Sequence, residues 1–197
     1  NPAAGKASDI LIEMGGTSIL SETPELIGAE HILAERAVNE KVADKLIEIV
    51  NRAEQDALDA GVDIRDANPS PGNKEGGLTT LEEKSLGCVH KAGSAPLSEV
   101  VEYAETPSRN GLTVMDTPGF DVESITGMVA GGAQIIVFTT GRGTIVGNPI
   151  APVIKVCGNT PTFSKMEDNM DINAGKIIDG ESTLEETGEK LFGLIEE

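Results

Sequence analysis

The sequence predicts an α/β fold with three layers, in which helices cover both faces of a mostly parallel, Rossmann-like sheet. Short apolar runs alternate with helix-like segments in the second half of the chain, which is typical of parallel sheets. The run at 134–139 has a continuously apolar centre, as expected for a strand that is covered on both faces. The chain has 197 residues, of which 39% are hydrophobic, enough for the core of one domain. We therefore expect residues 1–197 to form a single α/β domain.

The expected elements follow from apolar spacing and from capping residues. Strands are expected at residues 17–20, 112–115, 134–139 and 153–156. Helices are expected at residues 7–15, from Thr23, at 39–60, at 79–91, at 123–130, from Thr160 and at 182–195. The helix at 39–60 is the clearest, because apolar residues recur on one face at helical spacing. Residues 66–77 are dense in Asn, Pro, Ser and Gly, so no regular element is expected there.

Composition excludes several classes of function. The formal net charge of −18 disfavours binding to nucleic acids and to anionic membranes, because a phosphate surface would be repelled. No apolar run approaches the ~20 residues of a membrane span, and no signal peptide is evident. The two cysteines, Cys88 and Cys157, have no paired-ligand spacing, so reduced thiols in a cytoplasmic protein are expected. An anionic small molecule would need locally concentrated positive charge or a metal.

Three predicted strands end in residues that could form a site. Strand 17–20 leads into Ser21–Glu25, strand 112–115 into Asp116–Gly119, and strand 134–139 into Thr140–Thr144. Ligands of parallel sheets bind beyond the carboxyl ends of the strands, so these exits are expected to meet at one edge. In the third exit, Gly141 and Gly143 leave the backbone N–H groups accessible, and Arg142 could clamp a carboxylate; a tight turn with a solvated arginine is an equal alternative.

Other titratable residues are open to two interpretations. Lys74 and Lys84 are rare cations in an acidic chain, and a partly desolvated lysine can act as a base, although a lone lysine is usually a surface residue. His31 and His90 could carry protons or bind a metal, and a structural role is at least as common. The Asp116–Gly119 stretch is not a GTPase motif, because no phosphate-binding loop precedes it.

Four stretches resemble the altronate/galactarate dehydratase family. They cover nearly the whole chain and occur in the family's order: Glu22–His31, Asn68–Gly87, Phe138–Gly143 and Asp171–Gly175. The resemblance implies an α/β fold, cytoplasmic localisation and elimination of water from a sugar acid with the help of a divalent metal, usually Fe²⁺, with Mn²⁺ or Mg²⁺ as alternatives. It also implies that residues 1–197 are the catalytic C-terminal part of a longer chain. A Cys-Gly-Gly-Ser-Asp stretch and a small N-terminal domain would precede it, so the isolated fragment is expected to be inactive. A homodimer is a further expected assembly.

Position and residue type give the expected site, with residues 61–78 as an active-site loop. The expected base is Lys84 or Lys74, with His31 behind them, and Glu83 is a further catalytic or metal-supporting candidate. The metal candidates are Asp116 and Glu25. The substrate-binding candidates are Asn68, Ser70, Asn73, Thr79, Thr80, Thr140, Gly141, Arg142 and Gly143. This site requires the 68–77 loop and the Gly–Arg turn to face each other across a cleft.

Three alternatives stay open at this point. The substrate could be galactarate or altronate, each giving a 2-keto-3-deoxy product, or it could be sulfolactate, since the family also includes a sulfo-lyase. A non-catalytic binding or oligomerisation module would leave residues 68–84 exposed, with no cleft between the strand ends. A Rossmann-type nucleotide binder is disfavoured because the Gly-x-Gly-x-x-Gly motif is missing.

Overall fold

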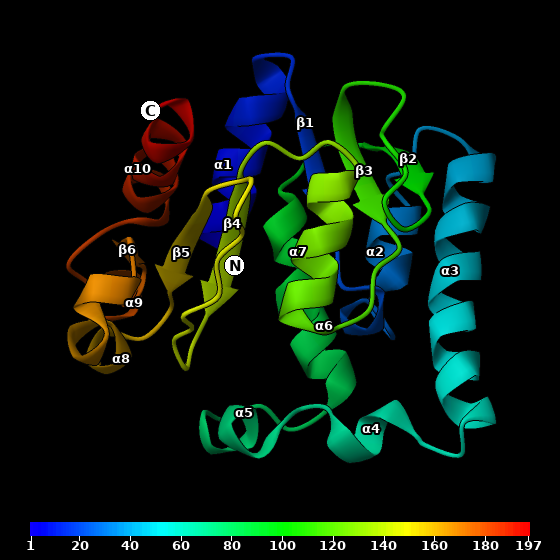
Figure 1. The fold of residues 1–197 in the computed structure, drawn as a ribbon, viewed down its shortest axis with the longest axis horizontal. Coiled ribbons are helices and arrows are strands. Elements are labelled where there is room, and N and C mark those ends of the chain that lie inside the picture. The colour runs from blue at the N-terminus through cyan, green and yellow to red at the C-terminus, as the bar shows by residue number, and fades with distance from the viewer.

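Two parallel three-stranded sheets form the centre of the molecule in the computed structural model, which describes residues 1–197 (Figure 1). The first sheet has the order β1 (Thr17–Leu20), β3 (Gly111–Met115), β2 (Leu97–Val101). The second has the order β4 (Ile136–Thr140), β5 (Val153–Cys157), β6 (Ile172–Asn173). Every strand pair is parallel. The predicted α/β class with parallel strands is confirmed, but the strands are divided between two sheets.

Helices cover both faces of the sheets. Figure 1 shows α7 (Asp121–Ala130) in front of the strands and α1 (Pro2–Glu13) behind them. Helix α10 (Leu184–Glu196) packs on α1, and α3 (Glu40–Asp59) packs on α2 (Glu30–Ala34) and on β2. The remaining helices are α4 (Ile64–Ala67), α5 (Pro71–Glu75), α6 (Leu81–Val89), α8 (Thr160–Lys165) and α9 (Gly175–Ile178). Single 3₁₀ turns are formed by η1 (Thr23–Glu25), η2 (His90–Ala92) and η3 (Glu167–Asn169).

Polar side chains fix the starts of the principal helices. The side chain of Asn39 accepts a hydrogen bond from the N–H of Val42 at the start of α3, and Thr80 accepts one from Glu83 at the start of α6. Thr183 and Glu186 form a reciprocal capping box on α10. Such caps satisfy backbone N–H groups that have no partner within the helix.

Each sheet has its own apolar core. A cluster of 15 buried residues joins β1, β2 and β3 to α2, α3 and α6. A cluster of five joins β5 and β6 to α1 and α10. All five residues of β3, the central strand of its sheet, are buried. In contrast, three of the four residues of β1 and four of the five of β4 are only half-buried.

Four expectations about local structure are wrong. The first helix begins at Pro2 rather than residue 7, and Thr23 opens a single 3₁₀ turn. Residues 66–77 contain regular structure, because Pro71 supplies a helical φ at the first position of α5. Strand β2 was not expected, since Ser98 and Glu99 interrupt its apolar run.

No helix in the structure is long and apolar enough to cross a membrane.

Candidate active site

A cleft of about 710 Å³ lies at the carboxyl ends of β1 and β4. Its walls come from the two strand exits, from α6 and from the segment around α5. The predicted loop contributes Ser70, Asn73 and Leu78, and the Gly–Arg turn contributes residues 140–143. The structure therefore brings together the two segments that the predicted site requires.

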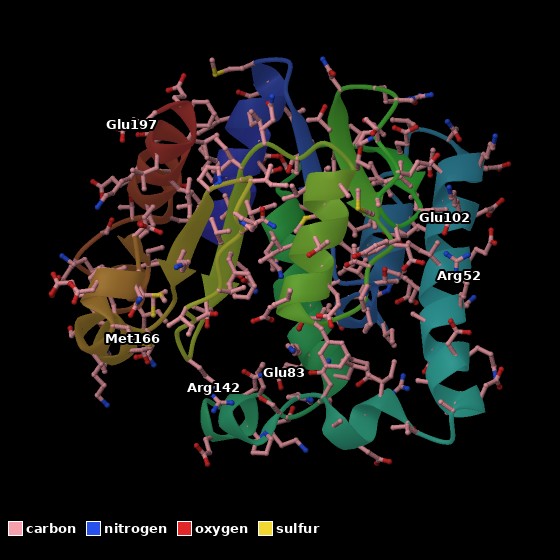
Figure 2. The ribbon with its side chains drawn as sticks, in the orientation of Figure 1. Arg52, Glu83, Glu102, Arg142, Met166 and Glu197 are labelled. Atoms are coloured by element: carbon pink, nitrogen blue, oxygen red, sulfur yellow. The ribbon has the colours of Figure 1, made fainter.

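The Gly–Arg turn is held against α5 by close packing. Figure 2 shows Arg142 extending from the end of β4 toward α5. A Cβ atom added to Gly72 would lie 2.8 Å from Nε of Arg142, so a glycine lets the arginine side chain cross the helix. Gly143 has a φ of +81°, and an added Cβ would meet the side chain of Met166. The N–H groups of Arg142 and Gly143 donate to Oγ1 of Thr140, so Thr140 shapes the turn and the N–H of Gly143 is already bonded.

Two lysines and two glutamates form a mostly buried cluster in the cleft. Lys84 Nζ lies 2.5 Å from Glu25 Oε1, and Lys91 Nζ lies 3.4 Å from Glu22 Oε2 and 3.8 Å from Glu25 Oε2. The side chains of all four residues are less than 20% exposed. The thiol of Cys88 donates to Glu25 Oε2 at 2.9 Å. Glu25 therefore joins the two lysines and the cysteine.

Glu22 and Glu25 have pKa values that are shifted in opposite directions by burial and by neighbouring charges. Burial raises the pKa of Glu22, and Lys91 opposes this only in part. Burial also acts to raise the pKa of Glu25, but Lys91, Lys84 and the Cys88 hydrogen bond outweigh it and lower that pKa to about 2. Two neighbouring carboxyls with opposite pKa shifts are typical of an acid/base site.

The cation and the thiol of the cluster keep their protons. Burial alone would lower the pKa of Lys91, but Cys88, Glu22 and Glu25 raise it above the usual lysine range. Burial raises the pKa of Cys88 to about 12. At neutral pH, Lys91 is therefore a fixed positive charge and Cys88 a neutral hydrogen-bond donor.

The turn that carries Glu22 is held by hydrogen bonds to Asp116 and Thr117, which follow β3. Glu22 has a φ of +69°, a left-handed conformation that is uncommon for a residue with a side chain. Its N–H donates to Oγ1 of Thr117 at 2.7 Å, and Thr23 Oγ1 donates to Asp116 Oδ1 at 2.5 Å. Backbone strain that is maintained by surrounding bonds is common at functional sites.

The structure places the predicted residues in four groups. The cleft is lined by Glu25, Ser70, Asn73, Lys84, Thr140, Gly141, Arg142 and Gly143. Asn68 lies beside it, since Lys84 Nζ donates to Asn68 Oδ1 at 2.9 Å. Thr79, Thr80 and Glu83 form the exposed start of α6, where Glu83 accepts hydrogen bonds from Thr79 and Thr80 caps the helix.

Lys74 and His31 lie outside the cleft lining and are exposed. Asp116 lies outside it as well, and its carboxylate faces α3, where Arg52 lies 2.6 Å away. The geometry of these three residues does not support direct contact with a molecule in the cleft. Asp116 instead helps to hold the turn that precedes Glu25.

The side chains of residues 1–197 do not by themselves fit the divalent metal that the resemblance implies. No three His, Cys, Asp or Glu residues are grouped as metal ligands. Asp116 is paired with Arg52, whereas Glu25 is paired with Lys84 and Lys91 in the cleft. A carboxylate that already holds two ammonium groups is a poor metal ligand, since the ammonium groups would repel the cation.

Three residues of the cleft cluster were not among the predicted site residues: Glu22, Cys88 and Lys91. A signal for two of them exists in the sequence. Lys84, Cys88 and Lys91 are spaced four and three residues apart, which places them on one face of the helix that was expected at 79–91. The sequence predicts that Glu22 follows a strand that ends at the site. Its left-handed backbone cannot be predicted from the residue type, because glutamate rarely adopts that conformation.

Comparison with known proteins decides the family. The family model "D-galactarate/Altronate dehydratase, C-terminal" matches residues 1–197.

The chain belongs to this dehydratase family.

Its relatives have several activities. It is 45% identical over 195 residues to "Galactarate dehydratase (L-threo-forming)" of Escherichia coli (strain K12), covering 99% of this chain and 37% of that protein. It is 43% identical over 179 residues to "Altronate dehydratase" of Bacillus subtilis (strain 168), covering 91% and 36%. It is 38% identical over 198 residues to "(2R)-sulfolactate sulfo-lyase subunit beta" of Chromohalobacter salexigens, covering 99% and 51%. The chain thus spans between 36% and 51% of the length of these dehydratase-family relatives.

Proposed function

We propose that residues 1–197 carry the substrate cleft and the proton-transfer groups of a lyase that eliminates water from a hexaric or hexonic sugar acid. The observation that carries this proposal is the buried Lys84–Glu25–Lys91–Glu22 cluster beside the Gly–Arg turn. The named dehydratases among the relatives support a sugar acid of the galactarate or altronate type. The product would be a 2-keto-3-deoxy acid.

The cleft brings three cations together beside the carboxylates of Glu22, Glu25 and Asp121. Lys84, Lys91 and Arg142 line the cleft, whereas the formal net charge of the chain is −18. Arg142 lies at the more exposed side, and its guanidinium can bind a carboxylate through two parallel hydrogen bonds. Lys91 would face the developing negative charge, because its ammonium group is fixed and largely removed from water.

Elimination requires one group to accept a proton and another to donate one. Glu22 is the proposed base, since burial raises its pKa and a carboxylate with raised proton affinity removes a carbon-bound proton more readily. It would take the proton on the carbon next to the substrate carboxylate. Lys84 is the proposed acid, because its ammonium group can protonate the departing hydroxyl, which leaves as water. The resulting enol then becomes the 2-keto product by proton transfer to carbon.

The assignment of Lys84 differs from the expectation that a lysine acts as base. Lys84 Nζ lies 2.5 Å from Glu25 Oε1 and donates to Asn68 Oδ1 at 2.9 Å, so its ammonium group already acts as a hydrogen-bond donor at the cleft. Glu25 would then position both lysines rather than react itself.

The Arg142 clamp is tested by Arg142→Ala in the whole protein. We expect kcat/KM for the sugar acid to fall about 10–100-fold, mainly through KM, because a charge-assisted hydrogen bond contributes about 1.5–3 kcal/mol. Arg142→Lys is the matched control: it keeps the charge but loses the bidentate geometry, so an intermediate KM is expected. Unchanged kinetics of Arg142→Ala would remove this residue from the site.

Elimination of sulfite from sulfolactate is the second candidate. It is favoured by the sulfo-lyase relative, which matches 99% of this chain at 38% identity. The same base and clamp would serve, because sulfite also leaves from the carbon adjacent to the one that loses the proton. Release of sulfite rather than formation of a keto-deoxy sugar acid distinguishes the two.

Two features are proposed to come from outside residues 1–197. A divalent metal such as Fe²⁺, Mn²⁺ or Mg²⁺ would need ligands beyond those of this chain, since its own carboxylates are held by cations. A further N-terminal domain of the same protein is proposed from the greater length of the relatives. The isolated chain is accordingly expected to be inactive.

A further inference from the structure

A groove of about 620 Å³ separates the two sheets. Its walls are the edge strands β1 and β4, while α1 lies on one face and α7 on the other, as Figure 1 shows. The apolar lining includes Leu11 and Ile19 from the α1–β1 side, Ile125 and Met128 from α7, and Val137 from β4. In a three-layer α/β fold, an interior strand lies between two parallel strands and between two layers of helices. The groove has the same neighbours on all four sides.

Strands β1 and β4 each have one edge that pairs with no other strand and faces the groove. The N–H of Gly111 donates to Gly16, and the N–H of Ile136 donates to Pro152. Because successive residues of a strand point their N–H and C=O groups to opposite sides, Thr17 and Ile19 turn these groups away from β3. By the same alternation, Val137 and Thr139 turn theirs away from β5.

These edges lack the features that protect a true edge strand. Neither β1 (Thr-Ser-Ile-Leu) nor β4 (Ile-Val-Phe-Thr-Thr) contains a charged residue or a proline. Exposed apolar edges of this kind promote association with other strands, so they are usually covered. Their half-buried side chains contrast with the complete burial of β3.

We infer that the two sheets are halves of one sheet whose middle strand is the stretch of chain that immediately precedes Asn1 in the whole protein. With three strands from each sheet and one in the groove, the order becomes β2-β3-β1, the inserted strand, then β4-β5-β6. The chain spans only 36–51% of the length of its relatives, so such a stretch has a source.

The position of Asn1 selects this occupant. Oγ1 of Thr139, near the carboxyl end of β4, donates to Oδ1 of Asn1 at 2.9 Å, and Asn1 is followed directly by α1. A strand that runs through the groove in the direction of β1 and β4 would end at this point. It would continue through α1 into β1, which forms a parallel strand–helix–strand unit with adjacent strands.

The handedness of the connections agrees with this placement. From β3, the chain crosses the groove through α7 on one face to reach β4. From the inserted strand, it would return in the opposite direction through α1 on the opposite face. Reversing both direction and face preserves the hand, so both crossovers can be right-handed, as such connections almost always are.

The groove opens into the cleft, since Glu22, Lys91 and Thr139 line both. The last residues of the strand would therefore reach the candidate active site.

Amide hydrogen exchange in the whole protein tests this inference. The inserted strand should protect the amides of Thr17, Ile19, Val137 and Thr139, with exchange rates within about tenfold of those of the β3 amides. Fast exchange of these four amides beside slow exchange in β3 would overturn it. Protection that appears only as protein concentration rises would also overturn it, because a second copy would then fill the groove.

Proline substitution in the whole protein gives a second measurement. Val137→Pro removes an N–H that points into the groove, whereas Phe138→Pro removes one that points to β5. If the groove holds a strand, the two substitutions should lower the midpoint of thermal unfolding by similar amounts. A near-normal midpoint for Val137→Pro beside a large loss for Phe138→Pro would show that β4 is a free edge and would overturn the inference.

Discussion

Glu22→Gln is expected to lower kcat by about 10²–10⁴-fold in the whole protein while leaving KM nearly unchanged. The amide keeps the size of the side chain and can still accept a hydrogen bond from Lys91, but it cannot take a proton from the substrate. Steady-state kinetics with the preferred acid measure both constants. A kcat within a few-fold of the unmodified protein would rule out Glu22 as the base.

Stability measurements separate this chemical effect from unfolding. The raised pKa of Glu22 means that its contribution to stability is fully present below the unfolded-state pKa and is lost as pH rises through the folded-state pKa. Glutamine keeps a hydrogen-bond acceptor for Lys91, which also retains Glu25 at 3.8 Å, so Glu22→Gln should leave the protein folded and should cost less stability than Lys91→Met. Loss of activity with retained stability would therefore point to proton transfer.

Lys91→Met is expected to lower the free energy of unfolding by about 3 kcal/mol at pH 8 and to abolish measurable turnover. The substitution keeps the length of the side chain but leaves the buried carboxylate of Glu22 without its cation, and an uncompensated buried charge is strongly destabilising. The loss should shrink as pH falls, because Glu22 can then take up a proton. Denaturant unfolding at several pH values measures this dependence.

A double variant tests the cause of that instability. Adding Glu22→Gln to Lys91→Met removes the unpaired charge, so most of the lost stability and its pH dependence should return, whereas activity should not. Glu25 retains Lys84 as a partner in both proteins. Equal instability of the single and double variants would mean that Lys91 stabilises the fold through packing rather than through charge.

The parts of the fold that the sequence predicts are those governed by local pattern. Helix α3 follows from its apolar spacing and its Asn39 cap, and β4 follows from its continuous apolar run. Strand β2 lacks such a pattern because Ser98 and Glu99 are only half-buried within it. The division into two sheets could not be predicted, since strand pairing depends on tertiary contacts rather than on the residues of one strand.

The candidate site was partly predictable for the same reason. The glycines around Arg142 and the polar 68–77 segment have unusual compositions, and both line the cleft. Proximity in space was not encoded in residue type: Lys74 and Lys84 are equally plausible in the sequence, yet only Lys84 faces Glu25. Likewise, the charge of Lys91 has a role only because Glu22 lies against η2, the turn that follows α6.

We propose that catalysis takes place in the cleft shared by the Gly–Arg turn and α6. The most direct measurement compares Lys84→Met with Lys74→Met in the whole protein, using galactarate, altronate and sulfolactate as substrates and both keto-acid and sulfite release as readouts. Lys84→Met should lower turnover of the preferred acid by about 10²-fold or more, while Lys74→Met should remain close to the unmodified protein. Loss of activity in Lys74→Met with normal turnover by Lys84→Met would contradict the account.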